Sequence, residues 1–258
     1  MASVTQRIRS ISQPYGGYIP RKNFLIKQLD DGKNLHPKEN INPSLVGMAV
    51  DYLTRFLMGT PREKAFTISL IGATFYDLST RSTSGLSHAR HLLEEIEGLD
   101  EKSVKAACQL VGYDVCFRAG ISGYKPVDEI QPDSNTIENI ITMVNRNLSF
   151  WKEYGPIIKD GFTFEGGYTE TINTGDGDFL TEDTLWDLKV LKKEPTSQNT
   201  LELLIYYLMG IHSIHPEFKK IQKLGIYNPR LNKVYTIKID EISDEVIEEV
   251  STKVIGYS

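Results

Sequence analysis

The sequence predicts an α/β protein in which helices flank a mixed sheet and a helical subdomain interrupts the core. Three observations lead to this prediction. Apolar residues recur at three- and four-residue spacing from residue 44 to about residue 155. Residues 161–190 are instead dense in Thr, Tyr, Phe and Gly and alternate at period two. The chain then returns to a helix, a hairpin and a final helix, so the helical insertion falls between the first core helix and the first core strand.

The first part of the chain contains the arm, the first core helix and the insertion. Residues 1–43 are rich in Gly, Pro and polar side chains, which predicts an irregular arm with little regular structure. The run Asn42-Pro43-Ser44 is a helix start, with Asn42 or Ser44 as the cap, and the helix should end near Gly59. The expected domains are therefore the arm at 1–43, a core made of 44–59 and 156–258, and a helical insertion at 60–155.

The second part of the chain supplies the strands. We expect three strands joined by tight turns within residues 161–190, followed by a helix over residues 199–215. Residues 224–240 are typical of a hairpin that turns across residues 228–232. A closing helix should follow, with Ser243 as its cap.

Composition limits the classes of protein to which the chain can belong. Its 258 residues are 40% hydrophobic and 24% charged, as in ordinary folded proteins, and no apolar run is long enough to cross a bilayer. The N-terminus lacks the apolar middle of a secretory signal, which predicts a cytoplasmic location and no membrane partner. Two cysteines, Cys108 and Cys116, are too few for a structural zinc or an iron–sulfur cluster and are expected to be buried thiols. The net charge of -5 is not that of a dedicated nucleic-acid binder, although an enzyme that collects carboxylates around metal ions can be acidic and keep a local basic groove.

The chemistry-bearing residues gather around WDLKV. Asp187 and Lys189 are two apart on an expected strand, so both project from one face while Leu188 turns into the core. Asp178 closes the preceding strand, and the short link FLTEDT should bring it back beside Asp187. Two carboxylates with a main-chain carbonyl, that of Leu188, suit Mg²⁺ or Mn²⁺. Such an ion activates water for hydrolysis, and Lys189 can orient that water or stabilise the transition state.

At these residues the sequence resembles the PD-(D/E)xK nuclease superfamily, and most closely its RecB-like branch. The resemblance covers residues 44–58 and 161–240, and it implies a restriction-endonuclease-like core and a Mg²⁺- or Mn²⁺-dependent deoxyribonuclease, endonuclease or exonuclease. It implies three metal ligands, with Asp51 on the first core helix joining Asp178 and Asp187, and it makes Lys189 the catalytic lysine. Two positions depart from the family pattern, because Gly177 stands where a proline is common and Glu202 where the branch usually has glutamine.

The resemblance also implies residues that position the substrate. Glu202 and Tyr206 fall on the helix after the motif strand, where the branch carries Gln and Tyr. Lys192 and Lys193 follow the strand, and they either contact phosphates or face water.

Several alternatives remain beside the nuclease hypothesis. The run GDGDF is also a turn sequence, so Asp178 and Asp187 could be solvated turn and strand-edge residues. The acids from Asp176 to Asp187 are not a calcium loop, because Thr181 stands where that loop needs glycine. A non-catalytic subunit of a phage-defence or recombination complex, keeping the fold as a binding or scaffolding module, is the main rival. The helical insertion is then a candidate surface for a protein partner.

The histidines and tryptophans have ordinary structural interpretations. The pairs His88/His91 and His212/His215 are each spaced three apart but lack a third ligand at suitable spacing, so polar or capping roles are favoured over zinc. Trp151 and Trp186 are expected in the core.

Overall fold

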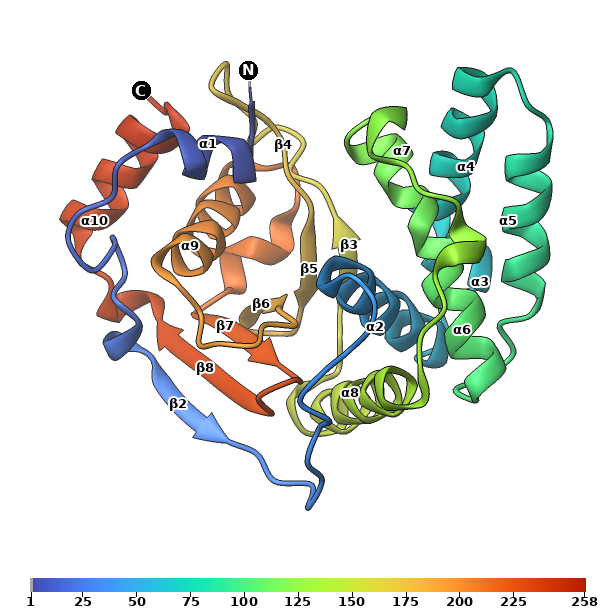
Figure 1. The fold of residues 1–258 in the computed structure, drawn as a ribbon. Helices are drawn as coiled ribbons and strands as arrows, with labels where there is room; N and C mark the ends of the chain where they lie inside the picture. The colour runs from blue at the N-terminus through green and yellow to red at the C-terminus, as the bar shows by residue number, and fades with distance from the viewer. Residues whose placement is uncertain (1) are drawn as a thin grey trace. The chain divides into compact units, whose positions relative to one another are not determined.

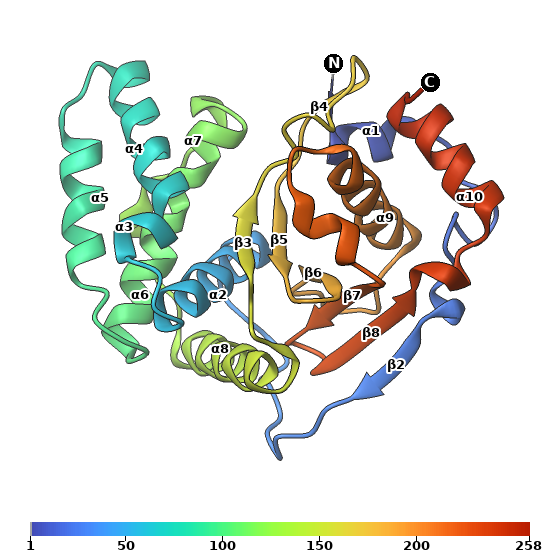
Figure 2. The same cartoon turned by 180° about the vertical axis from the view of Figure 1, so that it is seen from behind.

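The computed structural model describes residues 2–258 and divides the chain into two compact units. The sheet unit comprises Met1–Asp30 and Phe150–Ser258, and the helical unit comprises Asp31–Ser149. Figure 1 labels the helices and strands of the chain, and Figure 2 shows the same ribbon from behind. The protein is thus a mixed α/β protein with a six-stranded mixed sheet and many helices.

The sheet unit is built on strands in the order β2-β8-β7-β6-β5-β3. Its strands are β2 (Leu25–Gln28), β3 (Lys159–Phe162), β5 (Gly177–Leu180), β6 (Thr184–Leu188), β7 (Lys223–Asn228) and β8 (Lys233–Lys238). β6 and β7 are parallel and the other neighbours are antiparallel. A parallel pair needs a long crossover, and α9 (Ser197–His212) provides it. A second, two-stranded sheet pairs β1 (Ala2–Ser3) with β4 (Ile172–Thr174).

Apolar side chains cover both faces of the large sheet. On one face, inward residues of β6 to β8 pack against the apolar side of α9, which is buried over most of its length. The short helix α1 (Val4–Ser10) lies beside α9, as Figure 1 shows. On the other face, a cluster rich in aromatic rings surrounds Trp186, including Phe150, Trp151, Phe179 and Tyr227. The sheet is therefore buried on two sides, and a polar side chain that faces α9 sits in an apolar setting.

The helical unit is formed by consecutive helices, and the last of them, α8, follows a longer connection over residues 119–133 and ends in residues that belong to the sheet unit. Its α-helices are α2 (Pro43–Leu57), α3 (Arg62–Ala65), α4 (Thr67–Thr80), α5 (Ser84–Glu94), α6 (Glu101–Leu110), α7 (Asp114–Arg118) and α8 (Ser134–Tyr154). Asn42 caps α2 by accepting a hydrogen bond from the backbone N–H of Ser44 at 2.9 Å, and Pro43 occupies the first turn. Buried Cys108 and Cys116 lie in this unit as free thiols, as expected.

Short helical turns complete the chain. The 3₁₀-helices are η1 (Arg21–Asn23), η2 (Val111–Tyr113), η3 (Ile121–Gly123), η4 (Val127–Glu129), η5 (Pro216–Lys220) and η6 (Ile239–Glu241). At the C-terminus, α10 (Asp244–Glu249) runs into a π-helical segment, η7 (Val250–Ile255). Ser243 caps α10, as predicted. No helix within residues 2–258 combines the length and the apolar character that crossing a membrane requires.

Three details differ from the sequence prediction. The arm was expected to be irregular, but it contains α1 and the edge strand β2, whose short length leaves no periodic signal and which depend on partners far along the chain. Residues 159–188 form four strands instead of three, because β4 leaves the large sheet to pair with β1. The contact units also divide the chain near residues 30 and 149, whereas the predicted domains divide it at 43, 59 and 155.

Candidate functional site

The register of β5 and β6 brings the two predicted carboxylates together. Phe179 pairs with Trp186 in this antiparallel pair, so the next pair along is Asp178 and Asp187. Asp178 is the second residue of β5, which corrects the prediction that it closes a strand. The link between the strands is correspondingly short, because Leu180 ends β5 and Thr184 begins β6. The sequence GDGDF is typical of a turn, and for this reason the start of β5 at Gly177 was not predicted.

Asp187 and Lys189 share one face, as predicted, and this face is the one covered by α9. Leu188 lies between them and turns to the aromatic cluster on the opposite face. Lys189 follows the last residue of β6, and its backbone N–H donates to the Tyr227 carbonyl at 3.0 Å, so β6–β7 pairing continues through it. This pairing fixes the backbone from which the lysine side chain starts.

Lys189 lies between two carboxylates. Its Nζ is 3.1 Å from Asp187 Oδ2 and donates to Glu202 Oε2 at 2.7 Å. Glu202 and Tyr206 are one helical turn apart on α9, and the Tyr206 hydroxyl lies 3.4 Å from Glu202 Oε1. The structure therefore brings together the two residues predicted on β6 and the two predicted on the following helix. The Lys189 side chain keeps 22% of its surface exposed, so the group borders solvent.

Burial dominates the electrostatics of this group. Asp187 is 2% exposed, and burial raises its pKa well above the usual range; the charge of Lys189 opposes the rise, while Asp178 and Glu202 add to it. Burial alone would lower the pKa of Lys189, but the charges of Asp187 and Glu202 outweigh it and raise that pKa well above its usual value. Burial and Glu202 also raise the pKa of Tyr206. Lys189 is therefore kept as a cation by the carboxylates around it, and its positive charge offsets part of their negative charge.

The carboxylate oxygens at the site differ in their hydrogen bonding. Asp178 Oδ2 accepts a hydrogen bond from the Leu188 backbone N–H at 2.8 Å, which locks the side chain beside the end of β6. Asp187 Oδ2 is buried, and apart from its ion pair with Lys189 it receives no well-formed hydrogen bond from residues 2–258. A buried carboxylate oxygen without such a bond is costly unless something else binds it.

This donor set can be tested against a divalent ion. The oxygens of Asp178 and Asp187 are the hard ligands that Mg²⁺ and Mn²⁺ take, and Asp187 Oδ2, which faces the Lys189 ammonium but accepts no other hydrogen bond within residues 2–258, can also bind a cation. No group of three or more His, Cys, Asp or Glu side chains within residues 2–258 is arranged to hold a metal. An ion at this place would therefore have two carboxylate ligands from the sheet unit, those of Asp178 and Asp187.

Thr5 is a member of the site that sequence reasoning missed. Its Oγ1 lies 3.3 Å from Glu202 Oε1 and donates to it, from α1 at the beginning of the chain. No local pattern signals this contact, because it depends on α1 packing beside α9. Glu202 is thus engaged by Thr5 and Tyr206 through one oxygen and by Lys189 through the other.

The other predicted site residues lie apart from this group or in the other unit. Asp51 is on α2 in the helical unit, where its Oδ1 accepts from Arg55 Nε at 2.9 Å, and its role as a third ligand stays a prediction. Lys192 and Lys193 are exposed in the loop that follows β6.

The predicted core and polar residues have the following settings. Trp151 and Trp186 are buried, at 6% and 3% exposure, so both core predictions are confirmed. His88 lies near Asp128 and His91 near Glu95. In the sheet unit, the His212 ring contacts the Leu208 carbonyl and His215 lies between Lys159 and Glu165.

Comparison with known proteins adds no relative to this description. Neither the family models, nor the curated proteins, nor the solved structures that were compared with the chain contain a match.

Proposed function

We propose that the protein is a divalent-metal-dependent nuclease that hydrolyses phosphodiester bonds of DNA. The observation that carries the proposal is the position of Lys189 Nζ, 3.1 Å from Asp187 Oδ2 and 2.7 Å from Glu202 Oε2, at the end of a strand whose neighbour carries Asp178. DNA is chosen over RNA because of the resemblance to the RecB-like branch.

Each residue has a separate task in this proposal. Asp178 and Asp187 would hold the ion, with the carbonyl of Leu188 as a further oxygen ligand. A divalent ion supplies a water of lowered pKa and offsets the charge on the phosphate. Lys189, held as a cation by the charges of Asp187 and Glu202, orients the attacking water or stabilises the extra negative charge of the transition state. Glu202 holds the Lys189 ammonium group in place, and Tyr206 supports Glu202.

The order of elements in the sheet unit also supports the proposal. β3, β5 and β6 form an antiparallel run, α9 crosses over, and β7 adds parallel to β6. The RecB-like core has the same order of three strands, a helix and a strand. In both, the acid and the lysine stand on the third of these strands and the polar helix residues face them. A fold can serve many functions, so the argument rests on the side chains and uses the topology as support.

The test is a cleavage assay on plasmid and linear DNA with Mg²⁺, Mn²⁺ or EDTA, using the wild type and Lys189→Ala. The variant removes the cation and leaves both metal carboxylates, so cleavage should fall at least about a hundredfold. Lys223→Ala is the matched control, because Lys223 forms an ion pair with Asp183 at 2.8 Å on the same sheet and has no place in the proposed site. The control should cleave like the wild type.

Two results would contradict the proposal. Unchanged metal-dependent cleavage by Lys189→Ala would refute the assigned mechanism. A wild type that cleaves no DNA or RNA with either ion would favour the scaffold alternative, in which the Asp187–Lys189–Glu202 group is a structural ion cluster.

A further inference from the structure

A surface cavity of about 630 Å³ lies in the sheet unit where α9 begins. It is lined by Arg21, by residues 192–196 and by Leu231. Three of these residues are cations, namely Arg21, Lys192 and Lys193, and all three are exposed. We call it the cationic cavity. The net charge of the chain is -5, so this cluster of three cations differs in sign from the protein as a whole.

The single acid in the lining offsets only part of this charge, because one carboxylate faces three cations. Glu194 Oε1 accepts from Lys233 Nζ at 2.6 Å, and its other carboxylate oxygen accepts from the Tyr235 hydroxyl. The carboxylate is therefore bound first by a lysine from β8 that does not line the cavity, and the charge of Arg21 acts on it as well. An anion entering the cavity meets the positive charge of Arg21, Lys192 and Lys193.

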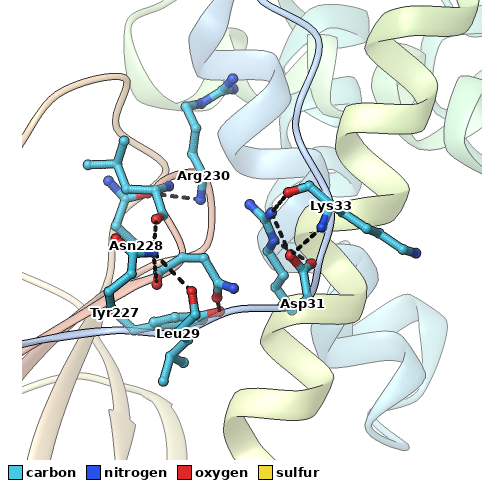
Figure 3. A network of polar contacts seen from close by, with 10 residues as sticks. Leu29, Asp31, Lys33, Tyr227, Asn228 and Arg230 are labelled. Carbon is cyan, nitrogen blue, oxygen red and sulfur yellow. Dashed lines mark hydrogen bonds and ion pairs between the residues drawn. The ribbon is translucent and has the colours of Figure 1, made fainter.

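The loop that carries the two lysines is held in place by buried Asn228. The Asn228 Nδ2 donates to the Leu191 carbonyl at 2.9 Å, and its Oδ1 accepts from the Leu191 N–H at 3.4 Å. The same oxygen accepts from the Arg230 N–H at 3.0 Å, a contact drawn in Figure 3. One side chain thus joins the loop after β6 to the β7–β8 turn, and it fixes the backbone directly before Lys192.

The segment that carries Arg21 is anchored on the first turns of α9. The Ile19 carbonyl accepts from Thr200 Oγ1 at 2.8 Å, and the Ile19 side chain is buried. Gly17 packs so closely on α9 that an added Cβ would lie 2.5 Å from the Ser197 Cβ, and its φ of +89° also favours glycine. Arg21 is two residues after Ile19, at the first position of η1. The backbone segments that carry Arg21 and the two lysines are therefore both held in place by hydrogen bonds and packing.

We propose that the cationic cavity binds the phosphodiester backbone of the nucleic acid whose cleavage is proposed above. Lys192 follows Lys189 by three residues, so the loop that leaves the acid–lysine group is the loop that lines the cavity. The beginning of the 16-residue helix α9 adds its dipole to the same side. Phosphate contacts of this kind position a substrate without reading its sequence. The inference rests on the proposed nuclease function for the identity of the anion.

The test measures binding separately from cleavage. Labelled single-stranded and double-stranded DNA oligonucleotides are titrated in EDTA, by fluorescence anisotropy, at a series of salt concentrations. The variant is Arg21→Gln/Lys192→Gln/Lys193→Gln. The matched control is Lys152→Gln/Lys219→Gln/Lys220→Gln, which makes the same charge change at exposed lysines elsewhere in the sheet unit. Thermal unfolding of both variants shows that the fold is retained.

The cavity variant should weaken binding at low salt by at least about tenfold, because three phosphate contacts are lost. The slope of log Kd against log salt should also fall by about two to three, at roughly 0.7 to 0.9 for each phosphate. The control should keep both affinity and slope. Equal losses in the two variants would show that only general charge matters and would overturn the inference, as would a wild type that binds no oligonucleotide.

The inference and the proposed function fail in different ways. Salt-dependent binding that needs the cavity, in a protein that never cleaves, would support the cavity and refute the nuclease. Cleavage and binding that are unaffected in the cavity variant would refute the cavity and leave the nuclease standing. Inorganic phosphate that competes with DNA only in the protein with an intact cavity would support a phosphate-binding site directly.

Discussion

The helical unit and the sheet unit both bury an aspartate completely, but they satisfy it differently. In the helical unit, Asp114 accepts from the Tyr52 hydroxyl at 2.7 Å and from Ser69 Oγ at 2.5 Å, so each carboxylate oxygen has a donor. In the sheet unit, Asp187 Oδ2 has an ion pair with Lys189 but lacks a well-formed hydrogen bond within residues 2–258. A buried acid with a full set of donors stabilises a fold, whereas one that lacks them is suited to bind something.

Burial raises the pKa of both acids, so the pKa alone does not separate them. For Asp114, burial is opposed first by the hydrogen bonds from Ser69 and Tyr52. For Asp187, burial is opposed by Lys189 but reinforced by the negative charges of Asp178 and Glu202. Each acid has a cation nearby, Arg118 or Lys189, so the other neighbours distinguish the two sites: hydroxyl donors at Asp114 and further carboxylates at Asp187.

The largest expected effect comes from making the same change, Asp→Ala, at these two positions. Asp187→Ala deletes a proposed metal ligand, so Mn²⁺ binding measured by calorimetry should be lost and cleavage should fall at least about a hundredfold. Its free energy of unfolding without metal should change by less than about 1 kcal/mol, since removing Asp187 relieves carboxylate repulsion and leaves Lys189 paired with Glu202.

Asp114→Ala should show the opposite pattern. Tyr52 and Ser69 lose a buried acceptor, which costs about 2 to 3 kcal/mol of unfolding free energy in urea denaturation. Mn²⁺ affinity per folded molecule should stay at the wild-type value. The comparison fails if Asp187→Ala proves the more destabilising of the two, because Asp187 would then be a structural residue.

Part of the site could be predicted from local spacing. Period-two alternation places Asp187 and Lys189 on one face, and one helical turn separates Glu202 from Tyr206. These relations follow from strand and helix geometry alone and do not depend on contacts with distant residues. Asp178 was placed beside Asp187 correctly but at the wrong end of its strand, because Gly and Asp favour turns and are uncommon in strands.

The remaining features depend on contacts between distant parts of the chain. Thr5 reaches Glu202 and Arg21 lines the cationic cavity only because residues 4–24 pack around α9. β2 carries exposed side chains at every position, so its sequence has no buried face to reveal it, and only pairing with β8 makes it a strand. Sequence patterns reveal helices and strands that bury one face. They do not reveal a strand that is held only by backbone hydrogen bonds to a neighbouring strand.

A second prediction concerns an ion pair within the helical unit. Asp31 and Arg146 form a two-bond contact, with Nε to Oδ2 at 2.7 Å and Nη2 to Oδ1 at 2.9 Å. The hydrogen bonds from Arg146 lower the pKa of Asp31, and the Lys33 N–H shown beside it in Figure 3 adds to this. A folded-state pKa below the unfolded value means that the stabilisation is complete above the unfolded pKa and is lost as the pH falls through the folded one.

Asp31→Asn should therefore destabilise the protein by about 1 to 2 kcal/mol at neutral pH, and the difference from the wild type should shrink as the pH falls below the unfolded pKa of about 3.9 and through the lower folded pKa. Hydrogen exchange resolved by segment, compared between pH values after correction for intrinsic rates, assigns the loss to residues 31–149. A double-mutant cycle with Arg146→Gln separates the pair from the other contact of Arg146, the Lys33 carbonyl. A pH-independent loss would mean that the charge on Asp31 contributes nothing.

The smallest expected effect compares one helix cap in each unit. Asn42 Oδ1 accepts from the Ser44 N–H at 2.9 Å at the start of the 15-residue helix α2, whereas Ser243 Oγ accepts from the Val246 N–H at 3.4 Å at the start of the six-residue helix α10. Asn42→Ala should cost about 1 kcal/mol, and Ser243→Ala should cost less than about half of that, because a longer hydrogen bond is weaker and a short helix has less to lose. Urea denaturation of the two variants ranks the costs, and hydrogen exchange shows where each one falls. A larger loss for Ser243→Ala would mean that α10 and the π-helix that follows it stabilise the sheet unit more than α2 stabilises the helical unit.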